Sequence, residues 1–131
     1  MQALQVKSRK REEMLDISNQ VQDLAREQGW KEGILFLFCP HTTAALTINE
    51  AADPTVAEDI LNCLRKLIPW QGEYRHMEGN SDAHIKSSLL GCSLQVPLSQ
   101  GKLALGTWQG VFFVECDGPR TRQVFLQLFA A

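Results

Sequence analysis

Four short strand candidates follow one another at the end of the chain, and the stretches that connect them are very short. The candidates are Ser93–Leu98, Lys102–Leu105, Trp108–Cys116 and Arg122–Phe129. The connections SQG, GT and DGPRT carry turn-forming residues, and connections this short are typical of antiparallel hairpins. The sequence therefore predicts that these four strands are antiparallel neighbours. Pro97 cannot donate to a sheet ladder, which predicts an edge position for the first strand.

The first half of the chain carries further strand signals. Alternating apolar and polar residues predict a strand around Leu4 and Val6, and a second strand is predicted over Met14–Ile17. The apolar run Ile34–Cys39 has the length of a strand, and we expect it to be buried on both faces. The β-branched residues of Thr42–Ile48 predict another strand.

Cap and stop residues define three helices. The predicted helices begin after Ser18, at Pro54 and at Ser81, and they end near Gly29, Pro69 and Gly91. Asp53 and Pro54 form the clearest start, because a carboxylate cap is followed by proline at the first helical position. We therefore predict one α+β domain spanning residues 1–131. Its antiparallel sheets are expected to form a β-sandwich-like arrangement, with two to three helices on one side.

Charge and hydropathy exclude two classes of partner. The formal net charge is −2, and the only basic cluster, Lys7–Arg11, is followed at once by Glu12 and Glu13. We interpret this cluster as a solvated loop, so no nucleic acid is expected as a partner. No apolar run approaches the roughly 18 residues of a membrane span, so no membrane partner is expected either.

The N-terminus and the cysteines predict a cytoplasmic protein. The N-terminus lacks the apolar core of a signal peptide. The four cysteines form no C-x-x-C pair, and each has apolar neighbours, so we expect reduced and mostly buried thiols.

The chain has only three histidines, His41, His76 and His84, and all three lie in polar, turn-rich stretches. Neutral imidazole is the commonest metal ligand in proteins, and three such ligands leave a fourth position for water or substrate. His76 and His84 are too far apart in sequence for a pair on one helical turn, but they could converge if the intervening loop folds back. Spacing alone leaves two alternatives open, namely a shared metal site or three unrelated surface histidines.

Other polar residues stand at the ends of predicted elements. Asn49 and Glu50 end an otherwise apolar strand. Asn80 precedes the third helix, where it could cap the helix or face an anion. Asp117 and Arg120 flank a Gly-Pro turn and suit a metal and a phosphate respectively, although such turns are commonly only polar hairpin ends.

GTWQG is an unusual stretch for a strand region. Trp108 and Gln109 stand between two glycines, and glycine in a strand often marks a bulge or a close backbone approach. The two side chains could belong to a core beside a bulge or to the wall of a pocket.

These motifs together resemble the YjbQ-like proteins, an uncharacterised protein family. The run Ser93–Val111, SLQVPLSQGKLALGTWQGV, matches the family signature over its full length. HTTAALTINE, the Tyr74-Arg75-His76 step, NSDAHIKSSLLG and DGPR match recurrent blocks of the family in the same order. The resemblance covers nearly the whole chain. Glu78-Gly79 departs from the more acidic or asparagine-rich step of the family, which puts only the local loop shape in doubt.

The resemblance implies a homotrimer and a divalent metal near His41, His76 and His84, and three neutral nitrogens favour zinc. Some members are named secondary thiamine-phosphate synthases, which implies a slow reaction on a phosphorylated or anionic metabolite. The candidate catalytic residues are then His84, Glu50 and Asp117. The candidate substrate contacts are Asn49, Asn80, Lys86, Trp108, Gln109 and Arg120.

Two hypotheses of different class follow. The first is a small metal-dependent enzyme with thiamine-phosphate synthesis as the named activity. The usual enzyme for that reaction resembles a TIM barrel of about 250 residues, which this chain is too short to form, so the activity would need a different site. The second is a non-catalytic metal- or metabolite-binding trimer.

Overall fold

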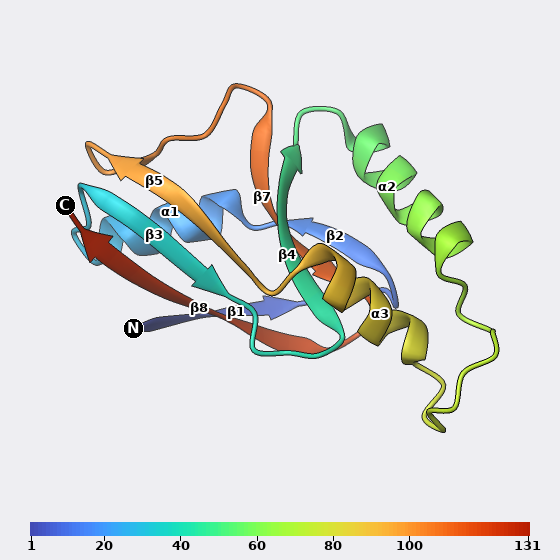
Figure 1. The fold of residues 1–131 in the computed structure, drawn as a ribbon. Coiled ribbons are helices and arrows are strands. Elements are labelled where there is room, and N and C mark those ends of the chain that lie inside the picture. Colours follow the sequence, from blue (N-terminus) through green and yellow to red (C-terminus); the bar gives the residue numbers. More distant parts are fainter.

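A computed structural model describes residues 1–131 and shows eight strands and three helices arranged around two antiparallel sheets (Figure 1). The elements are β1 Gln2–Lys7, β2 Glu13–Asp16, α1 Ser18–Glu27, β3 Gly33–Phe38, β4 Ala44–Glu50, α2 Pro54–Leu67, α3 Ser81–Leu90, β5 Ser93–Ser99, β6 Lys102–Leu103, β7 Gln109–Glu115 and β8 Thr121–Ala130. The larger sheet has the strand order β1-β8-β3-β5-β6, and the smaller sheet has the order β2-β7-β4. The predicted α+β class with antiparallel sheets is confirmed.

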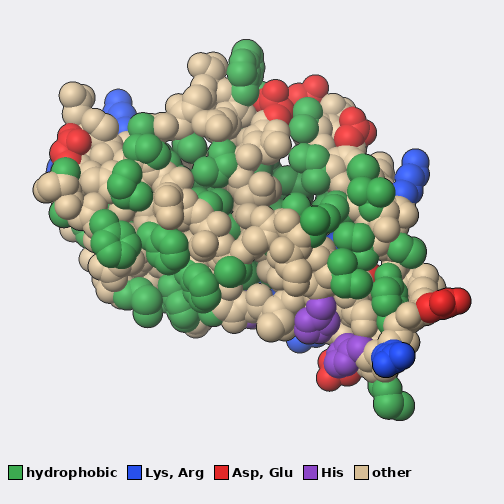
Figure 2. All heavy atoms as spheres, in the orientation of Figure 1, with side chains coloured by type: hydrophobic (Ala, Val, Ile, Leu, Met, Phe, Trp, Pro, Cys, Tyr) green, Lys and Arg blue, Asp and Glu red, His purple; other side chains and the backbone are tan.

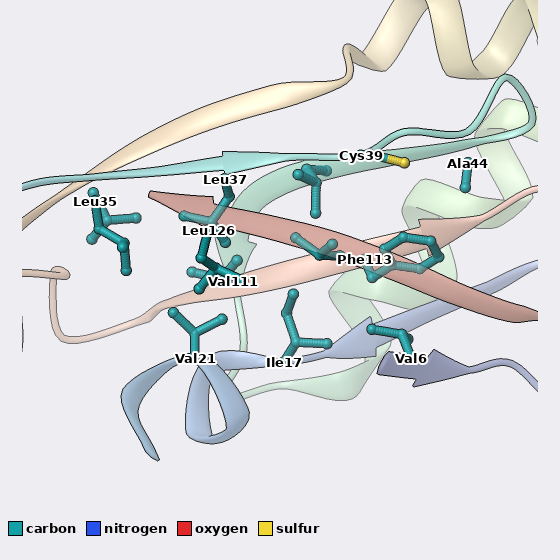
Figure 3. Close-up of a cluster of buried hydrophobic side chains, with 13 residues drawn as sticks. Val6, Ile17, Val21, Leu35, Leu37, Cys39, Ala44, Val111, Phe113 and Leu126 are labelled. Carbon is teal, nitrogen blue, oxygen red and sulfur yellow. The ribbon is translucent and has the colours of Figure 1, made fainter. Parts of the chain in front are cut away.

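The main hydrophobic core lies between the two sheets (Figure 3). The larger sheet contributes Leu35, Leu37 and Leu126, and the smaller sheet contributes Val111 and Phe113, all fully buried or nearly so. These residues alternate along their strands with residues that point away, as the two-residue period of a strand requires. The core therefore joins both sheets into one body.

The helices take two different positions. Helix α3 packs on β4, and α2 lies against β2 and β4, so both cover the outer side of the smaller sheet. Helix α1 instead adds Val21 to the core between the sheets. The amide side chain of Gln22 on α1 donates to the carbonyl of Gly101 and accepts from the N–H of Leu103, which ties α1 to the β5–β6 hairpin.

The predicted helix boundaries agree with the structure. The carboxylate of Asp53 accepts a 3.0 Å hydrogen bond from the backbone N–H of Thr55, and Pro54 is the first residue of α2. Gly29 and Gly91 follow α1 and α3 with φ of 68° and 102°, a backbone conformation that favours glycine. No helix has both the length and the apolar character needed to cross a membrane.

The prediction that all four C-terminal strands are neighbours is wrong beyond the first pair. Strands β5 and β6 do pair, but β7 lies between β2 and β4, and β8 lies between β1 and β3. The reason is the apolar character of β7, whose residues Val111–Glu115 are all buried. Such a strand must be buried on both faces. In the middle of the smaller sheet, the core buries one face and the helices bury the other. The β6–β7 and β7–β8 connections therefore cross between the two sheets.

Two further expectations are corrected. Strand β3 is buried on one face only, because no helix covers the outer face of the larger sheet. Leu35 and Leu37 point into the core, whereas Ile34 and Phe38 are 43% and 37% exposed. The thiols are free, as expected, but only two of the four are buried: Cys39 and Cys116 are buried, and Cys63 and Cys92 are exposed.

Candidate functional site

One surface pocket brings the three histidines together. Apart from Pro40, every side chain that lines it is polar or charged: His41, Thr42, Thr43, His76, Glu78, Asn80, His84, Asp117, Arg120 and Arg122. Histidine side chains are visible as a group at the surface beside α3 in Figure 2. A pocket without hydrocarbon walls suits a small, charged ligand better than an apolar one.

Strand pairing explains why distant segments meet here. Ala44 of β4 pairs with Glu115 of β7, so the residues just before β4 lie beside the residues just after β7. The backbone N–H of Cys116 accordingly donates to the carbonyl of Thr43 at 3.2 Å. His41 thus faces the β7–β8 turn, while α3 packs on β4 and carries the remaining wall of the pocket.

His41 is held by the backbone of β8. Its Nε2 atom accepts a 3.0 Å hydrogen bond from the N–H of Gln123, so in the neutral ring the proton resides on Nδ1. Partial burial, together with the positive charge of Arg122, lowers the pKa of His41 below its ordinary value. The ring is therefore neutral at neutral pH, and only Nδ1–H is free to meet a ligand while the Gln123 bond is kept.

His76 and His84 form a close pair on the opposite wall. Their ring centroids are 5.4 Å apart, and the rings are nearly perpendicular, at 87°. His76 comes from the loop between α2 and α3, and His84 comes from the first turns of α3. The Nε2 atom of His76 is 3.8 Å from a carboxylate oxygen of Glu78.

A hydrogen-bonded chain links α3 to the β7–β8 turn. The amide of Asn80 donates to a carboxylate oxygen of Asp117 at 2.8 Å, and Arg120 donates to the same oxygen at 3.0 Å. This arrangement fixes the orientation of the Asn80 amide. Its oxygen, Oδ1, is buried and has no hydrogen-bond partner in the chain. An unpaired buried acceptor is costly, so it favours a donor or a cation nearby.

Arg122 is a pocket residue that the sequence-based prediction missed. Its guanidinium group donates to both carboxylate oxygens of Glu115, which is fully buried, and to Thr43. Burial alone would raise the pKa of Glu115, but hydrogen bonds from Arg122 and Ser8 outweigh it and hold the pKa below the ordinary value. Glu115 at the end of an apolar strand is the sequence signal that could have pointed to this pair.

Lys86 lies outside the pocket, and its predicted phosphate contact is corrected. Its side chain is almost completely buried, and the ammonium group donates to Asp82 at 2.8 Å and to Glu12 at 3.0 Å. Arg11 binds the same Asp82 carboxylate through two nitrogens, at 2.9 and 3.1 Å. An ammonium group fixed by two carboxylates is not available to a ligand, so Lys86 stabilises the packing of α3 instead.

Four more predicted site residues gather at the other end of the smaller sheet. Asn49 and Glu50 end β4, and Glu50 pairs with Gln109 of β7. The N–H of Ala51 donates to the carbonyl of Trp108, whose side chain is 64% exposed. From Ala44 to Glu50 the strand rises about 3.3 Å per residue, or roughly 20 Å in total. Within one chain, these four residues therefore do not reach the histidine pocket, which corrects their predicted catalytic and substrate roles there.

The donor types in the pocket suit a divalent metal, but the side chains are not gathered around one point. No group of three or more His, Cys, Asp or Glu side chains has an arrangement that could hold a metal ion. His76 and His84 lie together, and Asn80, whose buried Oδ1 atom has no hydrogen-bond partner, also lines the pocket. Ligation by His41 through Nε2 would require it to release the N–H of Gln123.

Comparisons with known proteins identify relatives over nearly the whole chain. The family model described as "UPF0047 protein YjbQ-like" matches residues 2–131. The UPF0047 protein MJ1081 of Methanocaldococcus jannaschii is 52% identical over 95% of this chain and 90% of its own length. The UPF0047 protein YugU of Bacillus subtilis is 48% identical over 98% of both chains.

Solved structures show the same fold. A crystal structure of an uncharacterised conserved protein of the YjbQ/UPF0047 family from Clostridium acetobutylicum matches with a TM-score of 0.95 and 49% identity, covering 98% of this chain and all of the other. The conserved hypothetical protein TT1486 of Thermus thermophilus matches with a TM-score of 0.93 and 42% identity, over 98% of this chain and all of the other.

Proposed function

The chain belongs to the YjbQ-like UPF0047 family, and we propose that its histidine pocket binds a divalent metal, with zinc favoured, together with a phosphorylated or anionic metabolite. The observation that carries this proposal is the convergence of His41, His76 and His84 in a pocket with almost no apolar lining. Neutral imidazoles and an unpaired amide oxygen attract a cation, while the arginines on the facing wall attract an anion.

The metal would be held chiefly by the His76–His84 pair, with Asn80 and Asp117 as oxygen donors close by. When bound, a divalent metal stabilises the negative charge that develops on a departing phosphate or pyrophosphate group. His41 remains neutral because its pKa is lowered by burial and by Arg122. It can therefore orient a ligand oxygen through Nδ1–H or, after rotating, join the metal.

A slow thiamine-phosphate synthase activity is the reaction we propose for this pocket. Joining a pyrimidine diphosphate to a thiazole phosphate needs cationic and metal stabilisation of the departing pyrophosphate. His84 and Asp117 are the two predicted catalytic residues that lie in the pocket. We expect turnover well below the roughly 10 per second that is typical of dedicated enzymes.

A non-catalytic binding role is the second candidate, and the engagement of Asp117 favours it. The carboxylate of Asp117 accepts hydrogen bonds from both Asn80 and Arg120, and Glu50 lies at the far end of the sheet. The pocket therefore has no carboxylate near the strand wall that is free to act as a general base. Turnover measured with and without added metal separates the two candidates.

We also propose that the protein forms a homotrimer in the cytoplasm. Hydrophobic side chains gather over the larger sheet in Figure 2, where no helix covers its outer face. Phe36 stacks with Phe38 and meets Phe129 edge-on, each with ring centroids 6.4 Å apart. Such an exposed apolar face supports burial against another copy. Four free cysteines support a reducing compartment.

Metal stoichiometry tests the proposed function directly. Elemental analysis of protein dialysed against zinc is expected to find bound metal in the wild type and clearly reduced occupancy in His76→Ala and His84→Ala. Glu50→Gln is the matched control, because Glu50 lies at the other end of β4. Full occupancy in His41→Ala, His76→Ala and His84→Ala would exclude these histidines as ligands. If His84→Ala still forms thiamine phosphate, the reaction does not take place in this pocket.

A further inference from the structure

Arg122 combines deep burial with an unused donor group. Its side chain is only 5% exposed, yet it lines the histidine pocket. The Nε and Nη2 nitrogens are fixed by Glu115 and Thr43. The Nη1 nitrogen makes no hydrogen bond within the chain and is not sealed from solvent, because the Asn80 oxygen is the only buried side-chain polar atom without a partner.

Arg120 repeats this arrangement two residues earlier. Arg120 directly precedes β8 and Arg122 lies near its start, and both residues line the pocket. The Nε and Nη2 nitrogens of Arg120 donate to the backbone carbonyl and the carboxylate of Asp117, at 2.8 and 3.0 Å. Its Nη1 nitrogen likewise has no partner in the chain. A carboxylate thus holds each guanidinium group in place and leaves one amino group free.

We propose that Arg122 and Arg120 together form the phosphate-binding subsite of the pocket, with Arg122 as its buried member. This inference rests on the proposed function: the two arginines would bind the phosphate group of the metabolite. Two Nη1 groups supply four N–H donors, and His41 adds Nδ1–H. A phosphate group offers three terminal oxygens to these donors, whereas a carboxylate offers only two. The donor count therefore favours a phosphate ester.

Directional hydrogen bonds, rather than net charge, carry this recognition. Arg120 and Arg122 are balanced in the pocket lining by Asp117 and Glu78, and Glu115 lies behind Arg122. The pocket consequently has no strong positive field that would collect anions unspecifically. Because their carboxylate partners already hold the guanidinium groups in place, little conformational entropy is lost when a ligand binds.

Inorganic phosphate is the probe for the test, with the full-length protein stripped of metal by EDTA. In nitrogen-15 NMR spectra, the Nε–H signals of Arg120 and Arg122 are expected to shift saturably with phosphate. Arg120→Gln should weaken the apparent affinity at least about tenfold, because it removes a charge-assisted contact. Arg26→Gln is the matched control: Arg26 pairs with Asp23 at the same spacing as Arg120 with Asp117, but on the exposed side of α1.

Arg122→Lys keeps the charge but loses the planar fork, so it should also weaken phosphate binding by at least about tenfold. If this buried substitution prevents folding, the wild-type signals and Arg120→Gln still decide the question. Equal phosphate affinity in wild type and Arg120→Gln, or shifts spread evenly over surface arginines, would overturn the subsite. Zinc occupancy is measured separately on the same proteins. If the wild type binds zinc but not phosphate, only the phosphate subsite is excluded. If the wild type binds no zinc, the proposed function is excluded.

Discussion

The side-chain amide of Asn80 donates a 2.8 Å hydrogen bond to the carboxylate of Asp117, 37 residues further along the chain. Asn80 directly precedes α3 and Asp117 lies two residues after the end of β7, so this bond joins the helical wall of the pocket to its strand wall. Because Arg120 binds the same carboxylate oxygen, Asp117 is shared by both walls. Its loss is expected to disturb the whole site.

Comparing Asp117→Asn with Glu50→Gln tests which of the two predicted catalytic carboxylates takes part in the reaction. If Asp117 takes part in proton transfer, this substitution should lower the slow formation of thiamine phosphate by about 10²–10⁴-fold. Glu50→Gln should leave the rate unchanged, because Glu50 lies at the opposite end of β4. Rates are measured on purified, zinc-loaded variants. An equal loss in Glu50→Gln would mean that Glu50 of a neighbouring subunit reaches the pocket.

His41 should titrate below the ordinary histidine pKa of 6.5 in the metal-free protein, because burial and the charge of Arg122 both disfavour its protonated form. Nitrogen-15 NMR of the imidazole should show the proton on Nδ1 at neutral pH. Since the unfolded chain takes up this proton first, the stability contributed by neutral His41 is present above about pH 6.5 and declines as the pH falls below it. A folded-state pKa at or above 6.5 would mean that burial and the charge of Arg122 do not control the protonation of this ring.

Asp82→Asn should destabilise the protein by about 3–5 kcal/mol at pH 7, because it leaves the buried ammonium group of Lys86 without its main partner. Burial alone would raise the pKa of Asp82, but hydrogen bonds from Arg11 and Lys86 lower it below 3.8. Its contribution is therefore present above about pH 3.8 and is lost as the pH falls through the lower folded-state pKa.

Urea unfolding at a series of pH values measures this difference. The gap between wild type and Asp82→Asn should narrow towards acidic pH. Asp23→Asn, in an exposed ion pair with Arg26, is the control and should change stability by no more than about 1 kcal/mol. A gap for Asp82→Asn that is independent of pH would show that its charge is not the cause.

Phe36→Lys should break the proposed trimer, because it places a charge in the middle of the exposed aromatic group on the larger sheet. Light scattering at micromolar concentration is expected to give a trimer for the wild type and a smaller species for the variant. Trp108→Lys changes an aromatic residue that is also exposed but lies at the far end of the smaller sheet, and it serves as the comparison. A stable wild-type monomer would exclude the trimer.

The sequence by itself determined the features that depend on local interactions. A cap such as Asp53 binds the N–H of Thr55 two residues away, and Gly91 ends α3 through its own backbone conformation. Strand alternation likewise acts over a few residues, and for this reason the three helices and most strand segments were predicted close to their observed bounds.

Tertiary structure alone decided which of these parts meet. The register that pairs Ala44 with Glu115 brings His41 to the DGPR turn, and the same pairing carries Glu50 roughly 20 Å away along β4. Burial then gave two similar cations different environments: Lys86 is closed off by Asp82, whereas Arg122 keeps one edge open to the pocket. These outcomes depend on contacts between residues far apart in sequence, because register and burial are properties of the packed sheets rather than of any local stretch.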